Sequence, residues 1–192
     1  MATVFHQIIP SLRLLLAMTL LTGAIYPALV TLTGTILFPA QAAGSLVYTS
    51  AGQVVGSALI GQANADARYF AGRPSAGDYG TVPSAASNAG PTSAQLAAAV
   101  VERAAAFRTA NRLPADSPLP AEMLLASGSG LDPHISPAAA LAQVERVAGA
   151  RGLSPAAVAA LVTQQTEPPQ LGMLGTERVN VLLLNLALDG LQ

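Results

Sequence analysis

The stretch from Leu14 to Phe38, LLLAMTLLTGAIYPALVTLTGTILF, decides the architecture of this chain because it contains no charged side chain. As an α-helix it would be about 37 Å long, enough to cross a hydrocarbon core of roughly 30 Å with some tilt. A cleaved signal peptide, with Ala40-Gln41-Ala42 as its small-residue cleavage site, is the alternative. Its apolar region usually runs only about 7–15 residues. We therefore predict a retained membrane anchor.

The orientation of this span follows from the few charges on either side of it. Arg13 lies at its start, after the free α-amino group, whereas the next basic residue beyond it is Arg68. Basic residues close to a span stay on the cytoplasmic side, and a residue as distant as Arg68 does not compete. We predict residues 1–13 in the cytoplasm, a single span of the cytoplasmic (inner) membrane over 14–38, and an extracytoplasmic globular domain over 39–192.

Small or weakly polar residues recur at every fourth position of the span. They are Thr19, Gly23, Pro27, Thr31 and Thr35. Four residues turn a helix by about 400°, so these positions form a slowly winding stripe that would let another membrane helix pack closely. Such residues are also common in membrane helices generally, which leaves both interpretations open. Pro27 lacks the N–H that would bond to the carbonyl of Gly23, so we expect a bend there.

The composition excludes several classes of function. All nine basic residues are arginine, cysteine is absent and the net charge is −1. Because the arginines are scattered, no basic cluster is available to follow a phosphate backbone, and we expect no nucleic-acid partner. Without cysteine neither disulfides nor thiolate metal sites can form. Only two histidines are present, a poor basis for a transition-metal site, and we expect no metal.

Residues 39–192 are long enough for one α+β domain with a small β-sheet and several helices. Two valine-rich segments, Ser45–Tyr48 and Gln53–Ile60, predict strands joined by a short turn. The segment Tyr69–Pro91 is rich in glycine, serine and proline and predicts a long irregular loop. A helix is expected over Ser93–Arg112, whose apolar residues share one face.

Two further helices are expected where Ser-Pro pairs provide an N-cap and a first helical residue. Ser136-Pro137 precedes AAALAQVERVAGAR, and Ser154-Pro155 precedes AAVAALVTQQT, with Gly152 closing the first helix. A last helix, Glu177–Leu188, is apolar nearly all round, with Thr176 as its cap. We expect it at the centre of the core.

The loop ASGSGLDPHISP, residues 126–137, gathers serines, an aspartate and a histidine. A hydrolase using Ser129, Asp132 and His134 would need these groups on separate arms of the fold, and the G-x-S-x-G elbow is missing. A phosphate loop of the Walker type needs a lysine, and the chain has none. We favour a rigid shaped loop in which glycines 128 and 130 adopt special torsions and His134 bonds backbone carbonyls.

These residues resemble those of the KdpC family, the C subunits of bacterial potassium-transporting Kdp ATPases. The resemblance starts from the 126–137 loop and the following Gln143, Arg146, Val147, Ala148 and Arg151. It continues in VVGSALIGQ (54–62), YFAGRPSA (69–76), SNAGPTS (87–93) and RVNVLLLNLALD (178–189). The loop residues that carry it are Gln62, Arg73, Asn88, Ser127, Gly128, Ser129, Gly130, Asp132, His134 and Ser136.

The resemblance implies a subunit that is not itself an enzyme and that works within a high-affinity, ATP-driven potassium uptake complex. Its implied partners are a channel-like potassium-binding subunit, a P-type ATPase subunit and a small accessory membrane subunit. ATP and potassium are then handled by the complex, and we expect no cofactor bound directly to this chain. The family is also described as a catalytic chaperone that raises the ATP affinity of the ATPase subunit.

The topology inferred from charge conflicts with one form of that chaperone role. A domain outside the membrane cannot touch cytosolic ATP, so we favour an assembling and stabilising role. The alternatives are an anchored ligand- or nucleotide-binding module around Gln62, Arg73 and the 126–137 loop, and an anchored serine hydrolase. A further possibility is that the SNAGP turn or Asp132 guides potassium towards the channel subunit.

Overall fold

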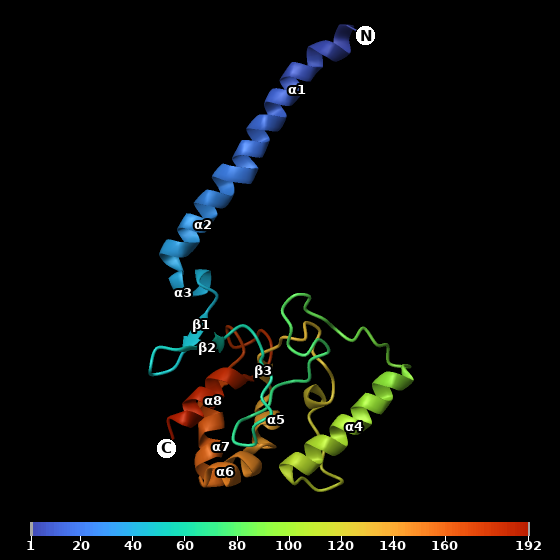
Figure 1. The fold of residues 1–192 in the computed structure, drawn as a ribbon, viewed down its shortest axis with the longest axis vertical. Coiled ribbons are helices and arrows are strands. Elements are labelled where there is room, and N and C mark those ends of the chain that lie inside the picture. The colour runs from blue at the N-terminus through green and yellow to red at the C-terminus, as the bar shows by residue number, and fades with distance from the viewer. Residues whose placement is uncertain (1, 192) are drawn as a thin grey trace. The chain divides into compact units, whose positions relative to one another are not determined.

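The computed structural model describes residues 2–191 and shows two compact units, Met1–Leu46 and Val47–Gln192 (Figure 1). The first unit is dominated by one helical rod, made of α1 (Ala2–Leu20), a π-helical turn (Leu21–Ile25) and α2 (Tyr26–Leu37). The stretch His6–Leu37 is long and apolar enough to cross a membrane, and none of its most apolar window is buried. The predicted apolar span is thus present as a helix.

The π-helical turn lies immediately before Pro27. The N–H of Tyr26 donates to the carbonyl of Leu21, five residues back, which is the π pattern. Proline removes one regular bond, and a wider turn is one way to accommodate the loss. The helix is irregular here, as Pro27 led us to expect, but the irregularity is a π turn and α1 and α2 continue as one rod (Figure 1).

The span is followed by a short helix, α3 (Pro39–Ala42), and then by a two-stranded sheet of β1 (Leu46–Tyr48) and β2 (Val54–Ser57). These strands confirm the predicted pair, although β2 ends before Ile60. It ends because the N–H of Ile60 donates to the carbonyl of Ser57, and that of Leu59 to the Ser57 hydroxyl, which closes a turn.

The predicted helix after the irregular loop is confirmed as α4 (Ala94–Asn111). Its N-cap is Ser93, whose Oγ accepts the N–H of Leu96 at 3.3 Å. Between Tyr69 and Pro91 the described chain has turns and bends only, as expected for that composition. A short 3₁₀ turn, η2 (Ala121–Met123), precedes the 126–137 loop.

Both Ser-Pro pairs start helices as predicted. They are α5 (Pro137–Leu141) and α7 (Pro155–Gln164), with the cap hydroxyls accepting N–H groups at 3.1 and 3.2 Å. The expected single helix over 138–151 is wrong, because the chain breaks at Gln143 and resumes as α6 (Val144–Arg151). The side chain of Gln143 is drawn into bonds with another segment at this break. Gly152 ends α6 with a φ of 68°, a conformation that favours glycine.

A second sheet, not predicted from the sequence, is made of three very short strands. Its order is β3 (His134–Ile135), β5 (Arg178–Asn180) and β4 (Thr166–Glu167), and both pairings are antiparallel. The predicted start of the last helix at Glu177, with Thr176 as cap, is therefore wrong. The helix is α8 (Val181–Asp189), and Asn180 caps it by accepting the N–H of Leu183 at 3.2 Å.

The core lies among α5, α6, α7 and α8, with α7 packed against each of the other three (Figure 1). Leu184 and Leu188 of α8 are fully buried, which confirms the central place predicted for the last helix. Phe70, from the irregular loop, is fully buried in the same cluster. Helices around two small sheets make the domain α+β, as predicted.

Candidate functional site

The centre of the domain is a five-residue segment, Ala67–Ala71, whose backbone is held almost entirely by side chains; we call it the clamped segment. Gln143 holds one end. Its Oε1 accepts the N–H of Ala71 at 2.8 Å, and its Nε2 donates to the carbonyl of Ala71 at 3.1 Å and to that of Ala139 at 3.2 Å. The side chain is fully buried. Gln143 thus pairs with Ala71 as a neighbouring strand would.

Asn185 of α8 repeats this arrangement one residue earlier. The N–H of Phe70 donates to its Oδ1 at 2.8 Å, and its Nδ2 donates to the carbonyl of Phe70 at 3.0 Å. Two buried amides therefore satisfy four consecutive backbone groups in a part of the chain without a strand. Because a buried backbone group left unpaired is costly, these bonds fix the segment in one conformation.

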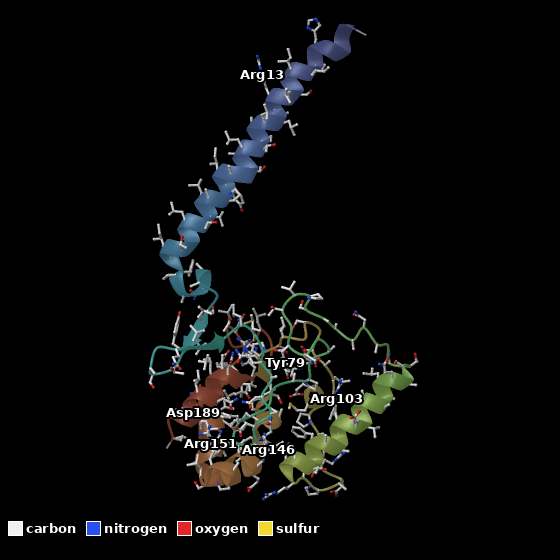
Figure 2. The ribbon with its side chains drawn as sticks, viewed as in Figure 1. Arg13, Tyr79, Arg103, Arg146, Arg151 and Asp189 are labelled. Carbon is white, nitrogen blue, oxygen red and sulfur yellow. The ribbon has the colours of Figure 1, made fainter. Side chains whose placement is uncertain are left out.

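Two arginines complete the clamp (Figure 2). Arg146 donates through Nη1 to the carbonyls of Ala67 and Tyr69 at 2.7 and 2.9 Å, and through Nη2 to Oε1 of Gln143 at 2.8 Å. Burial lowers the pKa of Arg146 from its ordinary value. Arg151 donates to the carbonyl of Arg68 at 2.8 Å.

Arg151 also joins the clamped segment to the end of α8. Its guanidinium lies 4.5 Å from the centre of the Tyr69 ring and forms a 2.6 Å ion pair with Asp189. The hydroxyl of Tyr69 donates to the same carboxylate at 3.3 Å. The polar atoms of these three side chains are thus directed to one another.

The 126–137 loop packs on the irregular segment that follows the clamp. Arg73 and Asp132 form an ion pair at 2.9 Å, and the Tyr79 hydroxyl donates to the carbonyl of Arg73 at 2.7 Å. Burial raises the pKa of Tyr79 above its ordinary value. The N–H of Ser127 donates to the carbonyl of Pro74 at 3.2 Å. The structure thus brings Arg73, Ser127 and Asp132 together, as parts of one packed loop system.

Close backbone approach explains two glycines of this region. Gly130 has a φ of +71°, and a Cβ on it would lie 2.6 Å from the carbonyl oxygen of Ala85. A Cβ on Gly61 would lie 2.6 Å from the carbonyl oxygen of Asp132, and the Gly61 N–H donates to the carbonyl of Leu131. The special torsion expected at Gly130 is confirmed, whereas Gly128 has no positive φ and no atom near its Cβ position.

The remaining residues predicted from the loops are dispersed. Gln62 is exposed and donates to the carbonyl of Val55 at 3.2 Å, and Asn88 is exposed with a φ of 49°. Ser136 caps α5, and its N–H donates to Glu122 at 3.2 Å. This bond and the charge of Arg73 outweigh burial, so the pKa of Glu122 is lowered.

In the described structure, Ser129, Asp132 and His134 do not form the hydrogen-bonded triad of a serine hydrolase. Ser129 is exposed and its hydroxyl accepts the N–H of Leu131, while Asp132 is paired with Arg73. The Nδ1 of His134 lies 3.5 Å from the carboxylate of Asp132, the acidic group two residues earlier in the loop. Within residues 2–191, no hydrogen bond links Ser129 to His134, and no three His, Asp or Glu side chains are grouped to hold a metal.

A cavity of about 200 Å³ lies between the β2 region, the clamped segment and α8. Its polar lining includes Gln62, Asn64, Tyr79, Asp132 and Asp189. These groups offer hydrogen bonds and negative charge, but no nucleophile beside a base. The cavity has room for a small polar group.

Known proteins match this sequence over nearly the whole chain. The family described as "K+-transporting ATPase, c chain" matches residues 8–190. The chain belongs to the KdpC family. The predicted resemblance is confirmed, and with it a place in potassium transport as a subunit of a transporting ATPase.

Relatives from several bacteria match most of the chain. The "Potassium-transporting ATPase KdpC subunit" of Sorangium cellulosum is 55% identical over 184 residues, covering 94% of this chain and 96% of its own. That of Cereibacter sphaeroides is 53% identical over 180 residues, covering 94% and 95%. That of Mycobacterium bovis is 49% identical over 188 residues, covering 97% and 99%.

The clamp was not predicted as a structural unit, although Gln143, Arg146 and Arg151 were among the residues that carried the KdpC resemblance. A sequence clue existed for its other member. Asn185 is a single amide in the apolar run VLLLNLALD, and such a residue needs a partner when the helix is buried. Its partner, Phe70, is 115 residues away, so no local pattern could identify it.

Proposed function

We propose that this KdpC chain is a non-pumping subunit that assembles and stabilises the channel-like and ATP-hydrolysing subunits of its potassium-transporting ATPase. The observation that carries the proposal is the contrast between the apolar helix, whose side chains are exposed, and the domain, where Gln143 and Asn185 bond to backbone atoms and Arg73 pairs with Asp132. Apolar surface of this kind associates with lipid and other helices, whereas satisfied polar groups have little to offer a reactant.

Packing of the span against partner helices is the step most open to test. Gly23 and Thr35 lie on its stripe of small residues, and the Thr35 hydroxyl donates to the carbonyl of Thr31 at 2.6 Å, so it needs no other partner. The π turn at Leu21–Ile25, which contains Gly23, takes more residues per turn, which reduces the winding of the stripe at that point. A Cβ at Gly23 would meet no atom of this chain within 4 Å.

The test is co-purification of the complex with a Gly23→Leu chain. We expect loss of the partner subunits, because a bulky side chain separates helices that approach through small residues. Ala24→Leu is the control, since it adds a similar side chain about 100° round the helix. If Gly23→Leu assembles as well as Ala24→Leu, the stripe is not a packing surface.

We also propose that the amino terminus faces the cytoplasm and the domain lies outside the cytoplasmic membrane. The support is Arg13, the nearest basic residue to the span, against Arg68 as the next one. Because the chain has no cysteine, Ala105→Cys on α4 and Gln7→Cys, which precedes the predicted span over 14–38, are unique labels on it. An impermeant maleimide should label only the first in intact cells, and both after lysis. Labelling of Gln7→Cys alone in intact cells would show that the domain faces the cytoplasm.

We propose that ATP and potassium are bound by other subunits, among them a channel-like subunit, a P-type ATPase subunit and a small accessory membrane subunit. Any rise in the ATP affinity of the ATPase subunit would then pass through subunit contacts. Gln143 supports this, since its amide is committed to Ala71, Ala139 and Arg146. Labelled ATP should show no saturable binding to the purified full-length chain; saturable binding would restore a nucleotide-binding module.

A further inference from the structure

The surface of the β1–β2 sheet is apolar. Four of its large side chains are exposed, to 43% at Leu46, 54% at Tyr48, 55% at Val54 and 38% at Val55, and Leu59 after β2 is 64% exposed. A two-stranded sheet is marginally stable in water on its own, and an exposed apolar group of this kind marks a contact surface. We call Leu46, Tyr48, Val54 and Leu59 the hairpin patch.

The hairpin patch lies in a long run of sequence without charged side chains. No Asp, Glu, Lys or Arg occurs between Arg13 and Asp66, so the uncharged run continues past the span and through both strands. By contrast, another exposed apolar turn, with Leu171 at 85% and Met173 at 79%, lies between Glu167 and Glu177. Charged side chains are costly in lipid, so the hairpin patch has a composition that a bilayer interface accepts, whereas the 171–173 turn is flanked by two glutamates.

The chain connecting the patch to the span is short. Seven residues, 39–45, separate Phe38 from Leu46, and four of them form α3. At 1.5 Å per helical residue and about 3.5 Å per extended one, this connection reaches roughly 17 Å at most. The headgroup layer on each side of a bilayer is about 5–8 Å deep. The first strand is thus tethered close to the membrane surface whenever the helix spans it.

We infer that the hairpin patch rests in the headgroup region of the bilayer at the end of the span, with phospholipid as its occupant. Tyr48 suits this place because its ring is apolar and its hydroxyl is polar. Leu46 and Tyr48 lie two residues apart on one strand and so project to the same face, which lets them enter lipid together. The inference rests on the proposed anchoring of the chain.

Photo-crosslinking in the assembled ATPase, in native membranes, tests the inference. A p-benzoylphenylalanine at Tyr48, and separately one at Leu59, should give this subunit a phospholipid adduct detectable by mass spectrometry. The same group at Val101 should give none, because Val101 is 70% exposed but lies beside Glu102 and Arg103. Agreement between the two patch positions guards against local misfolding at one of them.

The outcomes separate the inference from the proposed function. A crosslink from both patch positions to another subunit, or no lipid adduct at either, overturns the lipid contact. Alkaline carbonate extraction of the unmodified chain is run in parallel. If the chain stays in the membrane while the adduct is absent, only the patch inference fails; if carbonate releases the chain, the anchoring itself fails.

Discussion

The amino-terminal helix and the globular domain use their side chains in opposite ways. Along His6–Leu37 the apolar groups face outward and none of the most apolar window is buried. In the domain, the polar groups of Gln143, Asn185 and Arg146 face inward and hold backbone atoms. The comparison shows that the two parts of one subunit meet different needs: the helix needs an apolar environment, while the domain uses its buried amides and Arg146 to hold its own backbone.

Replacing Gln143 is expected to have the largest effect on stability, and it tests whether polar side chains hold the backbone of the domain. Gln143→Ala leaves the N–H and C=O of Ala71 without partners, and each such group costs about 1–3 kcal/mol, so we expect a loss of about 2–5 kcal/mol in the free energy of unfolding. Thermal unfolding of the full-length chain in detergent measures it. Gln164→Ala, at an exposed position near the end of α7, should change it by less than about 0.5 kcal/mol. Equal effects would mean that the clamp does not hold the domain.

A smaller effect is expected where backbones approach closely. Gly130→Ala should lower the stability of the domain by about 1–3 kcal/mol, because of its φ of +71° and the carbonyl of Ala85 at 2.6 Å. Gly128→Ala, two residues away in the same loop, has open space and should be nearly neutral. Chemical unfolding of the two variants side by side makes the comparison, and a neutral Gly130→Ala would show that the loop is not packed against Ala85.

The smallest effect is expected from pH. Hydrogen bonds from Arg68 lower the pKa of Asp66 from its ordinary 3.8 to about 2, and the pKa of Glu122 lies below its ordinary 4.5. A carboxyl group whose pKa is lower in the folded than in the unfolded chain stabilises the fold at pH values above its unfolded pKa. This stabilisation is lost as the pH falls through its folded pKa. The unfolding temperature should therefore decline from about pH 4.5 towards pH 2.

Substituting both carboxylates checks the source of that decline. A chain with Asp66→Asn and Glu122→Gln cannot lose these protonation-linked contributions, so its unfolding temperature should vary less over the same acidic range. It should also be slightly less stable near neutral pH. An unchanged acid slope in this variant would assign the pH dependence to other groups.

The features predicted correctly from the sequence are those that depend on residues close together in the chain. The apolar span, the Ser-Pro starts of α5 and α7, the Gly152 end and the β1–β2 pair all depend on residues close together in the chain. The sheet of β3, β5 and β4 was missed because its strands have two or three residues each, too few to show an alternating pattern. The start of α8 was misplaced for the same reason, since β5 occupies residues that the apolar run had assigned to a helix.

In the candidate site, too, local features were predicted and long-range contacts were not. In the 126–137 loop, the positive φ of Gly130 and the helix cap at Ser136 were expected from local sequence and are present, whereas the special torsion expected at Gly128 is not. The pairing of Arg73 with Asp132 and of Asn185 with Phe70 joins positions 59 and 115 residues apart. Only the packed core brings these side chains together, so composition and spacing could name the residues but not their partners.

Residues near the two ends of the domain are fastened to each other. Asn185 of α8 holds Phe70, and the amide of Asn180 donates to the carbonyl of Ala58, 122 positions earlier. A growing polypeptide therefore cannot complete its core until these late residues have been synthesised, which favours slow, all-or-none maturation. A truncated product that lacks α8 would leave Phe70 loose and open to proteases, so only full-length copies would survive to join the transporter.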